Sequence, residues 1–451
     1  MVIQIIGIVV ALLLFMILVY KGVSSFIVAP ICAIIIAVTN ALNPVDTFYL
    51  FSKGVGDMFV NLFAIIFLGV VLGRLYTDTG AASSIAKTLV TKFVQHRKGN
   101  NQVWIAMLIC ILMSGIMTMG GIDGFVLTFT IFPIYVVIAE MCDIPRRFLP
   151  AMLMLNCAFM VAPGAPQINN IAMVSALKGA GFTEVTSTAA LIPGLIGIIV
   201  IAVLCYITLS KFIIKAKSKG ETFDYGGIEK IDIFAEERKL PRFWVALLPL
   251  LTVFALYTVL KLDILIALSS GIVVCLITMG WNLKKKDGSY IKAIVSSLNR
   301  GADGYPHALT TIATPSGLAG VVLSTAAFGS IVAFLTTINI NPIWLTLIII
   351  CTIMALTSAP PVALYAGIPI LVGILVAKGL AFDVNAVGRV AAMATTTFET
   401  LPVNGMCVLT IALAKSTYKK SYPLMFINTF VWTIVGTLIT ALLCTFLPGI
   451  V

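Results

Sequence analysis

The stretch Ala162-Pro-Gly-Ala-Pro-Gln-Ile-Asn-Asn170 interrupts an otherwise apolar run that extends from residue 147 to residue 178. Two prolines and a glycine so close together end an α-helix. A second apolar run, residues 386–414, is interrupted by Glu399-Thr-Leu-Pro-Val-Asn-Gly405. Within a bilayer every backbone N–H and C=O needs a partner, so broken helices persist only where protein or a water-filled cavity satisfies them. Both stretches therefore predict interrupted membrane helices whose breaks mark a functional site.

The composition surrounding these breaks is that of a membrane protein. Of the 451 residues, 60% are hydrophobic and only 10% are charged, whereas soluble domains average about 25% charged residues. Apolar runs of roughly 17–25 residues, the length that crosses a bilayer as helix, recur along the chain. They lack the alternating pattern of a transmembrane barrel. We therefore predict an all-α polytopic membrane protein, with residues 3–20 as a retained span because no cleavage motif follows them.

We expect ten spans and two re-entrant hairpins. The expected spans are residues 3–20, 25–42, 57–75, 147–178 (interrupted), 187–213, 243–260, 262–281, 304–323, 386–414 (interrupted) and 423–447. The hairpins are residues 102–140 and 342–378, because both are apolar but have polar or Gly/Pro centres. The first half of the chain is then residues 1–213, the second half is residues 242–451, and the polar segment 214–241 is a cytoplasmic linker.

The distribution of basic residues supports this topology. If Lys21 faces the cytoplasm, 24 of the 29 Lys and Arg residues lie on the same side. The other side receives only Lys53, Lys178, Lys261, Lys378 and Arg389. This asymmetry is the one that the positive-inside rule predicts. It places both termini outside, in a cell inner (plasma) membrane, and it explains the net charge of +11 without nucleic acid as a partner.

The two halves also resemble each other. Residues Asn101–Trp104 (NQVW) match Asn341–Trp344 (NPIW). Upstream, Thr79–Ala86 match Thr325–Val332, and we expect each of these two segments to form a short helix along the membrane interface. Each half has five spans, and an odd number forces the second copy to be inserted upside down. The sequence therefore predicts two inverted repeats, each with a hairpin and an interrupted helix.

Four chain reversals supply the candidate site. The first hairpin turns at Thr118-Met-Gly-Gly-Ile-Asp-Gly124 and the second at Thr357-Ser-Ala-Pro-Pro361. With the two breaks, they give these candidate substrate-binding residues: Thr118, Gly120, Gly121, Gly164, Gln167, Asn169, Asn170, Thr357, Ser358, Ala359, Thr400, Asn404 and Gly405.

The chemistry of these reversals suits an anion. Half-helix N-termini offer unpaired N–H groups and partial positive charge, so converging ones bind a carboxylate without a buried Arg or Lys. None of the four reversals contains a basic residue. Asp123 and Glu399 are acids near the predicted midplane, where an ionisable group is costly and is therefore a functional candidate. Both are candidates for carrying the coupled proton. Alternatively, each carboxylate caps a half-helix or forms an ion pair.

Four stretches of the chain resemble a known protein family: Gly69-Val-Val-Leu-Gly73 through Ala81, Gly124-Phe-Val-Leu127, Phe159 through Gln167, and Thr400-Leu-Pro-Val-Asn-Gly405. In these the chain resembles the gluconate permease (GntP) family of the ion transporter superfamily. The resemblance implies a proton-coupled symporter for gluconate, 3-hydroxybutyrate or another short-chain hydroxy- or monocarboxylate. It also implies elevator-type alternating access, with 102–178 and 342–414 moving against the remaining spans, which form the scaffold and the contact of a homodimer.

The sequence departs from the family pattern at two positions. Pro163 and Val403 occupy places where members often carry a histidine, so a histidine contact is not carried over to this chain. The less polar Val403 favours an acid smaller and less hydroxylated than gluconate.

Alternatives remain open. Sodium coupling, as in a di- or tricarboxylate carrier, needs no diagnostic side chain, because unwound backbone carbonyls bind Na⁺. An anion channel would also use broken helices. The chain has no nucleotide-binding, hydrolase or zinc motif, so we expect no enzyme, no metal and no cofactor beyond co-transported H⁺, or Na⁺ as the alternative.

Overall fold

The computed structural model describes residues 2–21, 23, 25–94, 97–122, 124–228, 240–283, 289–357, 360–401 and 405–450. Within these residues every regular element is a helix, which confirms the all-helical class. Four predicted site residues, Asp123, Ser358, Ala359 and Asn404, lie outside the described residues.

The described helices of the first half of the chain are α1 (Val2–Tyr20), α2 (Ser25–Thr39), α3 (Pro44–Asp78), α4 (Ala81–Leu89), η1 (Val90–Val94), α5 (Asn100–Met119), α6 (Gly124–Met141), η2 (Arg146–Phe148), α7 (Leu149–Leu153), η3 (Met154–Ala158), α8 (Ile168–Gly179) and α9 (Leu191–Ser218). Those of the second half are α10 (Phe243–Phe254), η4 (Ala255–Val259), α11 (Ile264–Met279), η5 (Gly280–Asn282), α12 (Tyr290–Leu323), α13 (Ala326–Thr337), α14 (Pro342–Thr357), α15 (Pro360–Ala377), α16 (Val384–Thr395), α17 (Gly405–Leu413), α18 (Tyr418–Phe426), η6 (Ile427–Val431), α19 (Trp432–Phe446) and η7 (Pro448–Ile450).

Several helices are long and apolar enough to cross a membrane. By length and composition, five helical stretches among the described residues qualify, or up to seven if each bent pair of helices is one span. Two of the five, α5 and α15, are arms of the expected hairpins. The apolar window of α9 is only 33% buried, against 61% for α5. An exposed apolar surface of this extent is typical of a helix covered by membrane or by another protein.

The helices α3 and α12 begin earlier than the sequence predicted. We expected spans from residues 57 and 304, whereas α3 starts at Pro44 and α12 at Tyr290. Asn43 caps α3 by accepting a hydrogen bond from Val45 N, and Ser289 caps α12. These caps satisfy backbone donors that would otherwise be orphaned, so the polar first turns become helical.

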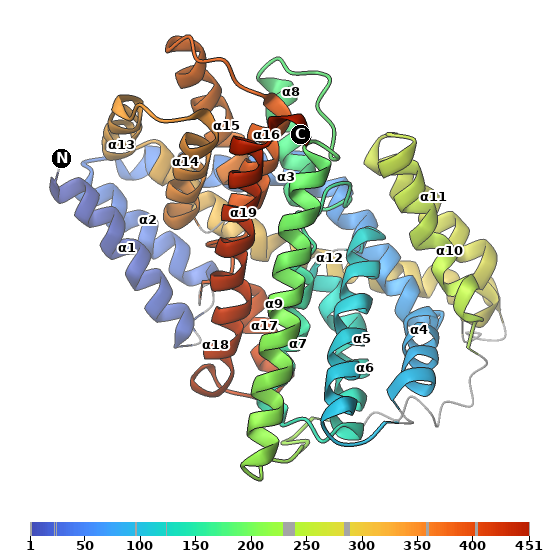
Figure 1. Ribbon diagram of the computed structural model, residues 1–451. Coiled ribbons are helices and arrows are strands. Elements are labelled where there is room, and N and C mark those ends of the chain that lie inside the picture. The colour runs from blue at the N-terminus through green and yellow to red at the C-terminus, as the bar shows by residue number, and fades with distance from the viewer. Residues whose placement is uncertain are drawn as a thin grey trace.

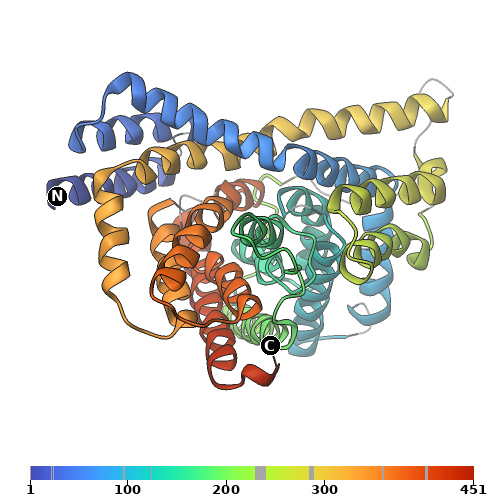
Figure 2. The ribbon, with the colours of Figure 1, turned by 90° about the horizontal axis from the view of Figure 1, so that it is seen from above.

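The helices form two groups (Figure 1, Figure 2). We call the first group the band: α1–α4 and α10–α13. Its centre is the long contact between α3 and α12, flanked by the reciprocal contacts α2–α12 and α3–α11. We call the second group the bundle: α5–α9 and α14–α19. Seen from above, the first three helices and α12 lie along one side of the bundle.

On the side of the bundle away from the band, α9 and α19 lie side by side (Figure 1, Figure 2). Their contact depends on glycine: a Cβ added to Gly197 would lie 2.9 Å from the Gly436 carbonyl, and one added to Gly436 would lie 2.8 Å from the Gly197 carbonyl. Close backbone approach of this kind is typical of membrane helix pairs. The sequence-based grouping assigns spans 187–213 and 423–447 to the scaffold. In the structure both helices pack with the bundle, because α9 contacts α5 and α16 and α19 contacts α14 and α16.

Each half also has a bent pair and a helix pair in the same order. The angle between the end of α3 and α4 with η1 is 60°, and that between the end of α12 and α13 is 72°. The predicted interfacial segments are thus helical. A contacting helix pair follows in each half, α5 with α6 and α14 with α15. The α5–α6 turn is made by Gly120, which ends α5, and by Gly121, whose φ of +83° favours glycine.

Candidate functional site

The first interrupted helix breaks where the sequence predicted. The helical turns η2, α7 and η3 end at Ala158, and α8 starts at Ile168. Gly164 in the break has a φ of +81°, its N–H donates to the Ser187 carbonyl at 2.9 Å, and its carbonyl accepts from Thr258 Oγ1 at 2.5 Å. The side-chain amide of Asn170 donates to the carbonyls of Ala162 and Ala165 at 2.7 and 3.0 Å. The broken backbone is therefore satisfied by protein, as a break within a membrane requires.

The first hairpin turn is fastened to this break by Gln167. Its Nε2 donates to the carbonyls of Thr118 and Ile122 at 2.7 and 3.1 Å. Gln167 is 3% exposed and Thr118 is 1% exposed. The Thr118 hydroxyl has no hydrogen-bond partner among the described residues. Two of the predicted reversals are thus in direct contact.

Gly120 and Gly121 lie against the band. A Cβ on Gly120 would lie 2.5 Å from Leu250 of α10, and one on Gly121 would lie 3.1 Å from Leu268 of α11. Gly121 and Gln167 also line a cavity of about 10 Å³, too small for a substrate. The glycines therefore allow the turn to approach α10 and α11 closely. A role for them in substrate binding stays a prediction.

The two interrupted helices meet at Asn169. Its Nδ2 lies 3.3 Å from Thr395 Oγ1, at the end of α16, and its side chain is hydrogen-bonded to the Glu399 carboxyl. Asn169 is 1% exposed and Glu399 is 8% exposed. The predicted proton-coupling candidate Glu399 thus contacts the N-terminus of α8, where helix N–H groups and the helix dipole favour negative charge.

Asn170, the next residue, contacts a buried cation that sequence reasoning misplaced. Arg389 was counted among the extracytoplasmic charges, but it lies on α16 and is 0% exposed. Its guanidinium donates to Asn170 Oδ1 at 2.9 Å, and to three backbone carbonyls: Val161 at 2.8 Å, Ala189 at 2.9 Å and Ser187 at 2.5 Å. Among the described residues no acid lies within ion-pair distance of it.

A buried guanidinium therefore lies beside the first break, which the sequence did not predict. Removing a guanidinium from water is costly, and hydrogen bonds to four carbonyl oxygens offset that cost here without an opposite charge. The signal in the sequence was a lone arginine among small apolar residues, Val387-Gly-Arg-Val-Ala391. An ionisable residue in such a setting is a functional candidate.

The second interrupted helix is described on both sides of its break. Helix α16 ends at Thr395 and α17 begins at Gly405. The Thr400 hydroxyl donates to the Thr429 carbonyl at 2.9 Å, and so it is directed toward η6. The Thr400 carbonyl accepts from Tyr422 at 3.2 Å. The structure therefore brings Glu399, rather than Thr400, to the first break.

Of the second helix pair, α14 with α15, it is α15 that contacts α8. Val362 and Ile168 belong to the same apolar cluster, so the start of α15 lies near the start of α8. The Thr357 hydroxyl donates to the Ile353 carbonyl one turn earlier at 2.8 Å. Asn156 of η3, which sequence reasoning missed, is 0% exposed, and no described residue accepts from its Nδ2.

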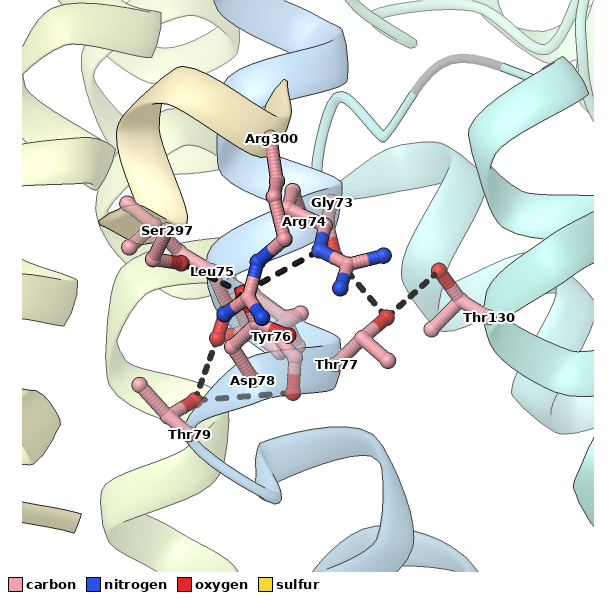
Figure 3. Close-up of polar contacts among 10 residues, drawn as sticks. All are labelled: Gly73, Arg74, Leu75, Tyr76, Thr77, Asp78, Thr79, Thr130, Ser297 and Arg300. Atoms are coloured by element: carbon pink, nitrogen blue, oxygen red, sulfur yellow. Dashed lines mark hydrogen bonds and ion pairs between the residues drawn. The ribbon is translucent and has the colours of Figure 1, made fainter. Parts of the chain in front are cut away.

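A second polar cluster, which the sequence analysis did not predict, joins α3 to α12 within the band (Figure 3). Asp78 Oδ2 accepts hydrogen bonds from Arg74 at 3.1 Å, Ser297 at 2.6 Å and Arg300 at 2.9 Å. These contacts join the end of α3 to α12. The neighbouring Thr77 hydroxyl lies 3.3 Å from that of Thr130 on α6. Figure 3 shows both contacts at the same end of α3, where the band touches the bundle.

Comparison with known proteins identifies the family. Residues 1–446 match the GntP family permeases. The chain belongs to the GntP permease family. The permease is therefore a multi-pass membrane transporter and not an enzyme, as the sequence predicted.

The relatives of the permease agree with this assignment. It is 24% identical over 478 aligned residues to the uncharacterized transporter YxjC of Bacillus subtilis (strain 168), covering 95% of this chain and 96% of that protein. It is 28% identical over 167 residues to the Gnt-II system L-idonate transporter of Escherichia coli (strain K12), covering 36% of each chain. The YdaH transporter of Alcanivorax borkumensis shares the fold, with a TM-score of 0.57, 13% identity and 90% of each chain covered.

Proposed function

We propose that this permease is a secondary active symporter for a small organic anion, such as gluconate, 3-hydroxybutyrate or another short-chain hydroxy- or monocarboxylate. Buried positive charge at the breaks carries this proposal: Arg389 has no acid partner among the described residues. A buried charge favours binding of the opposite charge nearby. The transporter of Escherichia coli that is similar to part of this chain is named for L-idonate, a hydroxylated carboxylate.

Proton coupling fits the same site. Consecutive residues of α8 contact the acid and the base, Asn169 with Glu399 and Asn170 with Arg389. A proton on Glu399 would neutralise one negative charge when the anion binds, so that the loaded site crosses the bilayer with less charge. Asp123 remains the second candidate for this role.

Sodium coupling, the alternative, is less favoured by these contacts. The carbonyls of Val161, Ala162 and Ala165 already accept hydrogen bonds from Arg389 or Asn170. A Na⁺ site made from them would lie beside a guanidinium cation. The repulsion between two such charges is strong where water is excluded.

The mechanism we propose is elevator-type alternating access, in which the bundle moves against the band. This differs from the sequence-based grouping only in that α9 and α19 move with the hairpins. Inverted repeats are supported by the reciprocal contacts α2–α12 and α3–α11 and by the matching bends. The helices α8 and α18 lie at opposite ends of the molecule (Figure 1), so we propose that α18, with Lys419 and Lys420, faces the cytoplasm and that both termini are outside. We also propose a homodimer formed through the band.

Uptake by reconstituted protein tests the function. Purified permease is first screened by thermal shift with mono-, di- and hydroxycarboxylates, and the ligands that raise Tm are assayed in proteoliposomes. We expect concentrative, saturable uptake driven by an inward proton gradient and unchanged when Na⁺ is replaced by K⁺. Flux through a conductance with no concentration against a gradient would instead indicate a channel.

A matched pair of variants localises the site. Asn169→Ala removes the buried amide that contacts Thr395 and Glu399. Asn385→Ala removes an exposed amide from the same chain and serves as the control. We expect uptake to fall at least about ten-fold in the first, the effect of about 1.4 kcal/mol, and to be unchanged in the second. Equal uptake in both variants would contradict the proposed site.

A further inference from the structure

A cavity of about 350 Å³ opens beside the first break, between α8, the loop from α8 to α9 and the segment from η4 to α11. We call it the lysine pocket. Two lysines, Lys178 and Lys261, line it together with six hydroxyl-bearing side chains, among them Ser187, Tyr257 and Thr258. Small-ligand sites typically have volumes of about 300–1,000 Å³. The pocket is therefore large enough for a small organic molecule.

The charge of the lysine pocket is positive. Lys178 and Lys261 are exposed, and among the described residues neither is in an ion pair. The one acid of the lining, Asp263, accepts a hydrogen bond from Leu265 N at 2.8 Å and caps α11. Its charge is thus directed at the helix N-terminus. Only five basic residues were expected on this side of the membrane, and two of them meet here.

The floor of the lysine pocket is bonded to the break. Ser187 accepts through its carbonyl from Gly164 N and from Arg389 Nη2, while Thr258 Oγ1 donates to the Gly164 carbonyl. One layer of backbone therefore separates the pocket from the buried guanidinium. An anion in the pocket would meet two lysines at the rim and a third cation beneath the floor.

We propose that the lysine pocket binds small hydroxylated carboxylates from the extracytoplasmic side, before they reach the breaks. The lysines attract the carboxylate, and the hydroxyl side chains exchange hydrogen bonds with the hydroxyl groups of the ligand. Passage onward requires the Thr258–Gly164 hydrogen bond to open. This inference rests on the proposed function for the identity of the ligand, but not for the charge of the pocket.

Uptake kinetics test the binding role. The double variant Lys178→Gln/Lys261→Gln is compared with Lys53→Gln, a control that removes an exposed lysine of the same expected side outside the pocket. Two unit charges at roughly 8 Å in water raise the local anion concentration about six-fold at low salt. We therefore expect KM to rise about six-fold at low ionic strength with Vmax unchanged, and the difference to shrink as salt is added. An unchanged KM at low salt in the double variant overturns the inference.

A second readout does not depend on transport. Thr186→Cys places a thiol in the pocket, where the natural cysteines do not compete, since eight of the nine are buried and Cys351 is partly buried. We expect an anionic methanethiosulfonate to react faster than a cationic one, and the preference to be lost in the Lys178→Gln/Lys261→Gln background. Absence of any preference overturns the charge assignment. If wild-type protein takes up no carboxylate while the preference is present, the proposed function fails and the anion-attracting pocket stands.

Discussion

Replacing Arg389 tests whether the buried guanidinium holds the two interrupted helices together. Arg389→Met keeps much of the volume of the side chain but removes all four described hydrogen bonds, to Asn170, Val161, Ala189 and Ser187. Arg389→Lys keeps the charge but replaces the planar fork with a single ammonium, which cannot reach acceptors on three segments at once.

The magnitude follows from these contacts. A hydrogen bond from a charged group contributes roughly 1.5–3 kcal/mol, so four of them represent about 6–12 kcal/mol of gross interaction. Relief of the desolvation cost of the guanidinium offsets part of this in the methionine variant. We expect a net loss of about 3–5 kcal/mol for Arg389→Met, because four buried carbonyl acceptors lose their donor at about 1–3 kcal/mol each. For Arg389→Lys we expect about 2–3 kcal/mol, because the ammonium retains one or two acceptors.

The assay combines thermal unfolding in detergent with uptake in proteoliposomes. We expect Tm to fall by several degrees in both variants. Uptake should be lost in Arg389→Met and partly retained in Arg389→Lys, because only the lysine variant keeps the positive charge. Asn385→Ala again serves as the control. A methionine variant with the Tm and uptake of the wild type would refute both the structural and the electrostatic reasoning.

Three further substitutions test other contacts. Gln167→Leu removes two hydrogen bonds to the first hairpin turn. We expect it to destabilise the fold by about 1–3 kcal/mol and to speed hydrogen exchange of residues 118–122. Unchanged exchange would contradict the contact. Gly164→Ala would place a Cβ 2.5 Å from Thr258 at a φ of +81°, so we expect uptake to be lost and Tm to fall. The control Gly179→Ala, with no atom within 4 Å of its Cβ, should keep the uptake and the Tm of the wild type. Asp78→Asn should cost about 1 kcal/mol because its arginine partners are partly exposed, and its Tm deficit should narrow at 1 M salt if the contact is electrostatic.

The breaks were predictable because proline and glycine act locally. Pro163, Gly164 and Pro166 exclude a continuous helix whatever lies around them. That the backbone of the breaks would be satisfied by protein or by a water-filled cavity was also expected, since orphaned backbone groups in a membrane need partners. The sequence could not say that Gln167 would be the partner.

The remaining features depend on packing between distant segments. Arg389 is the sixth residue of α16, near the expected interface, and only the loops around Val161 and Ser187 turn it into a buried cation. The apolar composition of α9 suits lipid or protein equally, so its place in the bundle follows from the contact with α19. The polar start of α12 becomes helical where Ser297 and Arg300 contact Asp78 of α3.

The glycine contact between α9 and α19 limits how the molecule can move. A Cβ on Gly197 would collide with Thr440 of α19, and one on Gly436 would collide with Ile201 of α9, so both positions need glycine. A shift of one helix along the other by a single residue, about 1.5 Å, would press side chains into these carbonyls. If the bundle moves as we propose, α9 and α19 therefore move together, although they come from different halves of the chain.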